Sequence, residues 1–512
     1  MKNRKHLLLM LPLLLLGMVS CNESKSEPLP SEITDNSDTQ NTSKDTTAPL
    51  EETAIESTPT TEEGNVSTES KTSESVSITD KDIFVVGSGY DSVQDGSYEH
   101  PCSIEKAILN LKPGGTIYLL EGTYKCYSTI MIALGNNGTA DNYKTIAPYN
   151  GAKVIFDFSG MSFNSANRGI SINGNYWHLK DVEITSSGDN GIYIGGNYNI
   201  VENCVTHDCS DTGIQLGRAK SSFTSIDQWP HDNLIKNCTS YDNHDPSGED
   251  SDGFACKLTT GVNNVFDGCI AYNNVDDGWD LYSKGDTGPI GAVTIKNCVA
   301  FNNGRTTKGV GTSNSDGNGF KLGGEGIAVS HTVINSVAFN NLACGFTDNS
   351  NPGTISMTAC TSYNNGVRDA DAINYSMCRD EKTSINNFKD VFSYCSGNKT
   401  NPITNATTIA NSKDEYKGTV EHSVFYSGLT MLKFDSIQAC DYTVESKRGT
   451  VLNTTEFPFV SVTAPDKQAD LHSLLRNADG SVNLGDFLKI KSGTVFATMS
   501  STGSSIGANL HN

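Results

Sequence analysis

Basic residues are scarce in this chain of 512 residues, in which 37 Lys and Arg stand against 59 Asp and Glu. The formal net charge of −22 argues against nucleic acid or an anionic membrane surface as a partner, because a protein holds such anionic partners by bulk positive charge of its own. The same charge argues against an acidic substrate, unless a cation lies between the two.

Long apolar runs are also missing, apart from residues 7–16, which are too few to span a bilayer. This run follows Lys2 and Arg4 and precedes small residues, which is the layout of a secretory signal peptide. The tetrapeptide Met18-Val19-Ser20-Cys21 resembles a bacterial lipobox. We expect residues 1–21 to be a lipoprotein signal peptide, with the mature protein lipidated at Cys21 and extracellular or at the cell surface. The alternative is an ordinary signal peptide that is cut near Ser20.

Residues 22–80 have almost no aromatic side chains and contain 14 acidic and three basic residues among Ser, Thr and Pro. Such a segment cannot bury enough apolar surface to offset the entropy lost on ordering. We expect a disordered tether here, followed by one working domain at residues 81–512, and a monomeric protein that touches the membrane only through its lipid.

Paired CxxC motifs are absent although the chain has 14 cysteines, so a zinc site is not expected. Secretion would favour disulfides. Yet five cysteines recur at one position of a repeat, where free thiols serve as small buried apolar groups. We expect mostly buried free thiols, with disulfides as the alternative. The five are Cys204, Cys238, Cys269, Cys298 and Cys360.

The repeat has a Cys or small residue, an aromatic residue or His three positions later, and in most copies Asn five positions later. Successive copies begin 24 to 38 residues apart and show no helical periodicity. This pattern predicts an all-β fold, a right-handed parallel β-helix solenoid whose coils stack about 4.8 Å apart. We expect the Cys, aromatic and Asn columns to form ladders inside the solenoid. The Asn column comprises Asn243, Asn274, Asn303, Asn341 and Asn365.

Both ends of the solenoid need cover, because a terminal coil exposes unpaired backbone groups. Residues 103–108 have the pattern of a short amphipathic helix just before the first strong strand pattern at 116–119. We expect this helix to cap the N-terminal coil. Residues 366–512 are less regular, and we expect their last part to close the other end.

A second recurring pattern, Gly-apolar-x-apolar, predicts where outward-facing side chains stack. The residue two positions after Gly faces outward by alternation, and in adjacent coils this residue is Asp280 and Lys321. The residue just before Gly is Asp252 in one coil and Asp277 in the next, so these two are also expected to stack. Asp276 lies in the adjoining turn. Four carboxylates with no outward His or Cys form a set of oxygen ligands that suits Ca²⁺. The alternative is a solvated acidic loop, because Asp-Gly is common in turns.

Three segments that carry these residues resemble the family 9 polysaccharide lyases, which are pectate lyases. The resemblance runs from about residue 84 to 400 and implies a right-handed parallel β-helix that cleaves polygalacturonate with Ca²⁺. It also implies calcium ligands at Asp252, Asp276, Asp277 and Asp280 and a base at Lys321. Cys256 replaces a residue that is more usually Ala, and the spacer between Asp280 and Lys321 differs in length from the family pattern. The segments are Asp252-Gly253-Phe254-Ala255-Cys256-Lys257, Asp276-Asp277-Gly278-Trp279-Asp280-Leu281 and Gly317-Asn318-Gly319-Phe320-Lys321-Leu322-Gly323-Gly324.

Such a lyase removes the proton at C5 of a galacturonate, next to a carboxylate whose charge must be neutralised. An unperturbed lysine has a pKa near 10.4, so a lysine base predicts an alkaline optimum. No outward acid is evident, and water is expected to protonate the leaving oxygen. Further cations could bind neighbouring uronates, and the candidates are Arg218, Lys257, Lys284, Arg305 and Lys308.

Three other functions are compatible with the same sequence. A rhamnogalacturonan lyase would use the same chemistry on a different acidic polymer. A polygalacturonase would use close carboxylates as acid and base without Ca²⁺. A surface lipoprotein that binds glycans and catalyses nothing would not need Lys321 beside the carboxylates.

Overall fold

The computed structural model describes residues 77–88, 94–368, 373–379, 385–400, 407–409, 413–428, 430–465 and 475–511. Cys21, the expected signal peptide and all but the last residues of the expected tether lie outside these ranges. Within the described ranges, no helix is long and apolar enough to cross a membrane.

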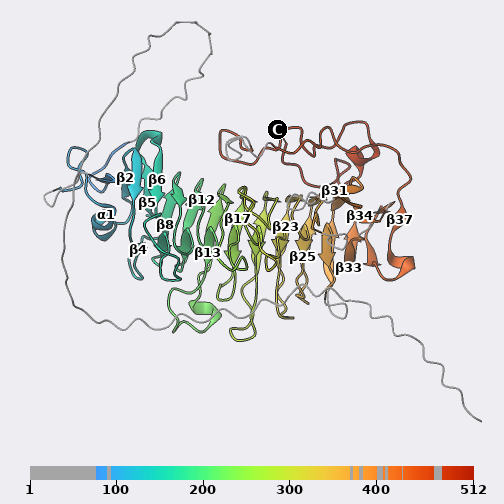
Figure 1. The fold of residues 1–512 in the computed structure, drawn as a ribbon, viewed down its shortest axis with the longest axis horizontal. Helices are drawn as coiled ribbons and strands as arrows, with labels where there is room; N and C mark the ends of the chain where they lie inside the picture. The colour runs from blue at the N-terminus through green and yellow to red at the C-terminus, as the bar shows by residue number, and fades with distance from the viewer. Residues whose placement is uncertain are drawn as a thin grey trace, which may run out of the picture. The chain divides into compact units, whose positions relative to one another are not determined.

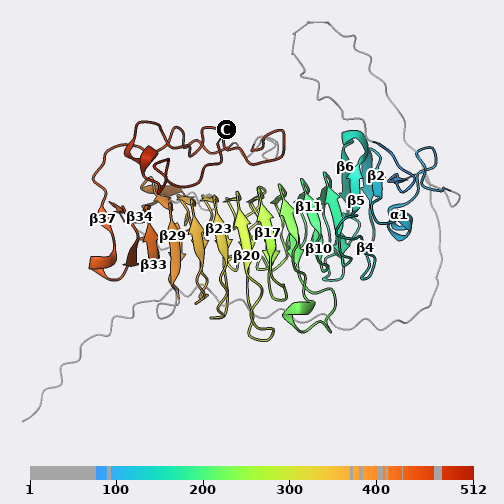
Figure 2. The same ribbon diagram turned by 180° about the vertical axis from the view of Figure 1, so that it is seen from behind.

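Short parallel strands wind into successive coils, and each full coil contributes one strand to each of three faces (Figures 1 and 2). We call these faces the site sheet, the second sheet and the third sheet. The site sheet contains β4 (Ile130–Ile132), β7 (Ile170–Ile172), β10 (Ile192–Ile194), β13 (Ile214–Leu216), β16 (Phe254–Cys256), β19 (Trp279–Asp280), β22 (Phe320–Lys321), β25 (Phe346–Thr347) and β28 (Tyr375–Met377). The second sheet contains β1 (Ile83–Val85), β2 (Thr116–Leu119), β5 (Lys144–Pro148), β8 (Trp177–Lys180), β11 (Ile200–Glu202), β14 (Leu234–Lys236), β17 (Asn264–Asp267), β20 (Val293–Lys296), β23 (Thr332–Ile334), β26 (Ser356–Thr358) and β29 (Asn386–Lys389).

The third sheet is parallel until its last strands, where β34, β35 and β37 pair antiparallel. It contains β3 (Gly122–Lys125), β6 (Val154–Asp157), β9 (Glu183–Thr185), β12 (Val205–His207), β15 (Thr239–Tyr241), β18 (Ile270–Tyr272), β21 (Val299–Phe301), β24 (Val337–Phe339), β27 (Thr361–Tyr363), β30 (Phe392–Tyr394), β34 (Ser423–Ser427), β35 (Thr430–Phe434) and β37 (Thr450–Val451). The predicted parallel β-helix is confirmed.

The N-terminal cap is also as predicted. Helix α1 (Ile104–Asn110) begins after Ser103, whose side chain accepts a hydrogen bond from the backbone N–H of Lys106. The helix buries Ile104, Ala107 and Ile108 against the first coils. At the other end, β33 (Glu415–Glu421) joins the site sheet to the second sheet and pairs antiparallel with β36 (Gln438–Asp441). Further short elements are the hairpin β31 (Asn398–Thr400) and β32 (Thr407–Ile409) and the 3₁₀ helices Tyr149–Gly151, Ile226–Gln228, Glu445–Lys447 and Val495–Thr498.

The cysteine column is fully buried in the core, in the same cluster as large apolar side chains of the sheets. All 13 cysteines in the described part of the chain are free thiols, as the sequence favours. Several thiols of the column donate to backbone carbonyls, as Cys238 Sγ does to Val201 O at 3.4 Å. These thiols therefore act as small core groups with weak hydrogen bonds.

The asparagine column forms the predicted ladder. Asn243, Asn274, Asn303, Asn341 and Asn365 are fully buried, and each side-chain amide from Asn243 to Asn341 donates to the Oδ1 of the next member at 2.8 to 3.0 Å. Each Oδ1 also accepts a backbone N–H of the previous coil. A second ladder starts at the turn before the second sheet, where Asn233 Nδ2 donates to Asn264 Oδ1 at 3.0 Å. We did not predict it, although Asn199, Asn233 and Asn264 repeat the 34- and 31-residue spacing of the cysteines.

Removal of one rung should be costly. Asn303→Ala removes the bonds that link the side chains of Asn274, Asn303 and Asn341, and it leaves the backbone N–H of Asn274 without its side-chain acceptor in a dry interior. We expect the free energy of unfolding to fall by about 3 kcal/mol. Chemical denaturation measures this loss. Asn387→Ala is the control, because Asn387 is exposed on β29 and should change stability by less than about 0.5 kcal/mol. Equal effects of the two substitutions would show that the ladder does not contribute.

The aromatic column faces outward, and our prediction that it lies inside the solenoid is wrong. Rings stack from His207 to Phe339 along the outer surface of the third sheet, with centroids 4.6 to 4.9 Å apart. Alternation along each strand turns the middle residue, such as Ala300, into the core and its neighbour Phe301 outward. Both faces of this sheet are apolar, because a second layer covers the outer one.

That second layer is the C-terminal segment 475–511, which runs back over the third sheet instead of only closing the last coil (Figures 1 and 2). Phe487 packs edge-on against Phe339 at 4.7 Å. Arg476 donates to the carbonyls of Cys238 and Gly268 at 2.8 and 2.7 Å, far back along the solenoid. The antiparallel strands β33 to β37 occupy the end of the solenoid in its place.

Candidate active site

The site sheet brings the predicted residues into register. Ala255 of β16 pairs with Asp280 of β19, and Asp280 pairs with Lys321 of β22. At the start of each strand, the N–H of Gly253 donates to the carbonyl of Asp277, so Asp252 and Asp277 occupy equivalent positions of adjacent coils. Glycine is required at position 253 because a Cβ there would lie 2.7 Å from that of Ala271 and 2.8 Å from a backbone oxygen. The stacking that we predicted from the spacing is therefore confirmed.

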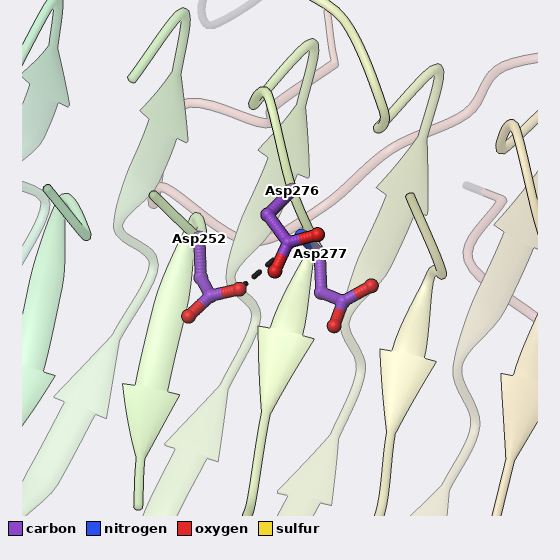
Figure 3. A group of neighbouring side chains, drawn as sticks. All are labelled: Asp252, Asp276 and Asp277. Atoms are coloured by element: carbon purple, nitrogen blue, oxygen red, sulfur yellow. Dashed lines mark hydrogen bonds between the residues drawn. The ribbon is translucent and has the colours of Figure 1, made fainter. Parts of the chain in front are cut away.

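Asp252, Asp276 and Asp277 lie close together at the turns that precede β16 and β19 (Figure 3). One carboxylate oxygen from each lies within 4.8 Å of the other two, and all three residues are buried. The backbone N–H of Asp277 donates to Asp252 Oδ1 at 3.2 Å, and the N–H of Asn318 donates to Asp277 Oδ1 at 2.6 Å. Backbone bonds thus fix the directions in which the carboxylates point.

The crowding is electrostatically unfavourable without a cation. Burial raises the pKa of Asp252 well above its ordinary value, and Lys257 opposes this rise. The pKa of Asp276 is raised well above its ordinary value by burial and by the charge of Asp277. Burial raises the pKa of Asp277 to about 7, against the influence of Lys321. A cation placed among the three groups would lower all of these pKa values.

Lys257 lies inside the cluster. Its Nζ donates to Asp252 Oδ2 at 2.9 Å and lies 3.4 Å from Asp280 Oδ2, and its side chain is 6% exposed. We predicted this lysine as a contact to substrate carboxylates, and the structure pairs it with two expected calcium ligands. Lys257 thereby holds Asp280 near the three other carboxylates. Asp280 does not belong to the group of three whose oxygens lie within 4.8 Å of one another.

Lys321 faces the opposite side of the cluster. Its Nζ lies 3.2 Å from Asp277 Oδ2 and 3.0 Å from Asp316 Oδ2. Burial would lower the pKa of Lys321, but the carboxylates of Asp316, Asp280 and Asp277 outweigh burial and hold the pKa well above 10.5. The ammonium also lies 5.7 Å from the ring centroid of Tyr282.

Asp316 is a residue that we did not predict. It precedes the Gly317-Asn318-Gly319 turn, and its N–H donates to Asp276 Oδ1 at 2.6 Å. It belongs to the long connection between β21 and β22, where no repeat column applies. The only signal in the sequence was a carboxylate five residues before Lys321. Because Asp316 does not belong to a repeat column, the direction of its side chain could not be predicted.

This connection is part of the spacer between Asp280 and Lys321. Residues 302–319 fold back over earlier coils, where the N–H of Thr307 donates to Asp242 Oδ1 at 2.6 Å and Thr312 Oγ1 donates to Ser247 O at 3.2 Å. Cys256 points into the core and is fully buried.

Four further predicted cations lie outside the cluster. Arg218 is half-buried, and its Nη1 donates to the carbonyl of Phe223 at 3.5 Å. Lys308 is 69% exposed and pairs with Asp208 at 2.7 Å. Arg305 is buried, and burial lowers its pKa to about 10, although it forms no ion pair with the described residues. Lys284 is half-buried in a turn closed by hydrogen bonds from Thr287 and Gly288, and it too has no ion pair within the described ranges. Their contact with substrate stays a prediction.

The donor set fits a hard divalent cation. All candidate ligands are carboxylate oxygens, which Ca²⁺ prefers. Asp280 Oδ1 is buried and has no hydrogen-bond partner in the described part of the chain, which is costly unless a cation or water meets it. Asp252, Asp276, Asp277 and Asp280 could therefore hold Ca²⁺ together.

Comparison with known proteins agrees with this geometry. The family model for the Pel9A-like right-handed β-helix region matches residues 83–401. Pectate lyase L of Paenibacillus polymyxa (strain SC2) is 42% identical over 406 residues, which cover 79% of this chain and 80% of that protein. The pectate disaccharide-lyase of Dickeya chrysanthemi is 36% identical over 266 residues, but these cover only 31% of its length.

Solved structures show the same fold. The crystal structure of pectate lyase Pel9A superposes with a TM-score of 0.60 at 25% identity, covering 85% of this chain and 97% of that one. A rhamnogalacturonan lyase gives a TM-score of 0.54 at 22% identity, covering 80% and 97%, which is a likeness of fold alone. The chain belongs to the family 9 polysaccharide lyases, the enzymes with a Pel9A-like right-handed parallel β-helix.

Proposed function

We propose that the protein is a pectate lyase that cleaves polygalacturonate by β-elimination, with Lys321 as the base and Ca²⁺ held by Asp252, Asp276, Asp277 and Asp280. The observation that carries this proposal is the register of the site sheet, which places Lys321 on the coil next to the carboxylates. The relatives named pectate lyase support the substrate.

Lys321 is the side chain that would remove the proton in this reaction. Lys321 Nζ accepts the proton from C5 of the galacturonate that lies over the site sheet, and the bond to the leaving oxygen at C4 breaks as the C4–C5 double bond forms. Asp277 and Asp316 hold the Nζ in place between them. When bound, Ca²⁺ neutralises the carboxylate next to C5 and lowers the pKa of Lys321. No side chain is assigned to the leaving oxygen, which takes a proton from water.

The product identifies the reaction. Mass spectrometry of oligosaccharides released from polygalacturonate, methylated pectin, rhamnogalacturonan and alginate should show chains with an unsaturated end, formed fastest from polygalacturonate. Products that have instead gained one water molecule would identify a hydrolase. Unsaturated products from rhamnogalacturonan alone would retain the chemistry and change the substrate.

Activity should rise with pH, because Lys321 must lose its proton and its neighbours hold its pKa high. Asp316→Asn removes one of these charges, 3.0 Å from Nζ. We expect the acid limb of the kcat profile to move to lower pH by about one unit. The control is Asp267→Asn, which unpairs Lys296 on the second sheet and should leave the profile in place. A wild-type rate that is flat from neutral to strongly alkaline pH would contradict Lys321 as base.

We also propose that the protein is exported and anchored to a bacterial membrane through lipid on Cys21. The lipobox-like tetrapeptide before Cys21 supports this localisation. Metabolic labelling with a radioactive fatty acid should mark the wild type and not Cys21→Ser. Equal labelling of the two would contradict the anchor.

A further inference from the structure

Lys257 neutralises two of the residues that are proposed to hold calcium. Its ammonium lies 2.9 Å from Asp252 Oδ2 and 3.4 Å from Asp280 Oδ2, and almost none of its side chain is exposed. An ammonium at these distances takes the place that a bound cation would otherwise take beside the same two oxygens. The calcium-free site thus contains its own counter-ion.

The four proposed ligands are divided by this lysine. Asp252, Asp276 and Asp277 converge within ligand distance of one another, and Asp280 stays outside that group. The Oδ2 of Asp280 is paired with Lys257, and its Oδ1 is buried without a hydrogen-bond partner within the described residues. A buried carboxylate with only one of its two oxygens paired is stabilised more by a divalent cation than by an ammonium.

The second buried lysine of the cluster, Lys321, has a partner outside the proposed ligand set. Besides Asp277, it pairs with Asp316, which is not among the proposed ligands and could keep the ammonium when Ca²⁺ binds. Lys257 is paired at 2.9 and 3.4 Å with two proposed ligands, Asp252 and Asp280. A divalent cation held by Asp252 and Asp280 would therefore repel the Lys257 ammonium at close range. A lysine ammonium on a flexible four-carbon stem can swing out of the way.

We propose that Lys257 is a displaceable counter-ion of the calcium site. Its ammonium neutralises Asp252 and Asp280 in the calcium-free protein and leaves them when Ca²⁺ binds. The displaced ammonium then turns away from the two carboxylates, and it can meet a substrate carboxylate only in the loaded enzyme. This inference rests on the proposed calcium role, and it adds that Lys257 weakens Ca²⁺ binding.

Calorimetric titration of Ca²⁺ into the full chain at mildly alkaline pH tests the inference. Lys257→Met removes the competitor while keeping a similar stem, and its affinity should rise about tenfold over that of the wild type. Lys257→Arg retains the charge and should not gain affinity. The control Lys296→Met removes a lysine paired with Asp267 on the second sheet, and it should bind as the wild type does.

The possible outcomes separate the two proposals. Equal or weaker affinity in Lys257→Met would overturn the counter-ion and leave the calcium site standing. Absence of binding by the wild type would overturn the calcium site itself, and the counter-ion with it. A tighter Lys257→Met with an unchanged control would support both.

A measurement on the wild type covers the case in which Lys257→Met does not fold. Reductive methylation followed by peptide mass spectrometry should modify Lys257 several times more when Ca²⁺ is present, because the ammonium leaves its buried pair. Modification of Lys296 should not respond to Ca²⁺. Equal or greater protection of Lys257 with Ca²⁺ would show that the lysine stays in place and would overturn the proposal.

Discussion

Lys321→Ala should reduce kcat on polygalacturonate by about 10²–10⁴-fold, the range that a positioned general base contributes. The substitution removes the only lysine in the described ranges that is paired with both Asp277 and Asp316. KM should change much less than kcat, because substrate binding depends mainly on the cation and the surrounding surface. The rate of unsaturated product formation measures the effect.

Loss of a buried positive charge also destabilises the folded protein, so the stability of Lys321→Ala must be measured together with its activity. Five carboxylates then share one ammonium, and breaking a buried pair costs about 3–5 kcal/mol. The thermal midpoint of Lys321→Ala should therefore fall, and saturating Ca²⁺ should restore most of it. Lys296→Ala, on the second sheet, should keep full kcat. If Lys321→Ala, folded and loaded with Ca²⁺, keeps more than about a tenth of the wild-type kcat, another group is the base.

Asp277→Asn should weaken Ca²⁺ binding by roughly 100-fold or more, because this carboxylate lies at the centre of the cluster and ligand charge sets calcium affinity. It is fully buried, and its Oδ1 is already oriented by two donors from Asn318. An amide keeps the shape and removes the charge. Calorimetric titration gives the affinity without reference to activity.

Two comparisons make this result specific to the site. Activity of Asp277→Asn should return when Ca²⁺ is raised well above the new Kd, which a misfolded protein would not show. Asp267→Asn removes a carboxylate that pairs with Lys296 on the second sheet, and this variant should bind Ca²⁺ as the wild type does. Unchanged affinity in Asp277→Asn would remove this residue from the ligand set.

The sequence predicts the solenoid and the site for the same reason. Coils of nearly constant conformation place equal positions of the repeat on top of one another, so a column in the alignment becomes a row in space. Asp252 beside Asp277 and Asp280 beside Lys321 follow directly. No knowledge of long-range packing was needed for these pairs.

Features outside the repeat could not be predicted in this way. Asp316 lies in a connection that crosses other coils, so no column gives its position. The aromatic column alternates correctly, but alternation does not tell which face is the interior when both faces are apolar. Phe301 faces outward because residues 475–511 return to cover it, and this return depends on contacts such as Arg476 with Gly268, over 200 residues apart.

The net charge of −22 does not exclude an acidic substrate. Much of it lies in residues 22–80, outside the domain that carries the site. Within the site, the carboxylates are arranged for a cation, and their pKa values are raised as long as none is present. An acidic protein can therefore bind an acidic polymer if Ca²⁺ lies between them.

The most direct test follows the ultraviolet absorbance of unsaturated product during incubation with polygalacturonate. The absorbance should rise with Ca²⁺, stop when a chelator is added and resume when Ca²⁺ is restored in excess. New reducing ends that appear without this absorbance, or a rise that the chelator does not affect, would contradict calcium-assisted β-elimination.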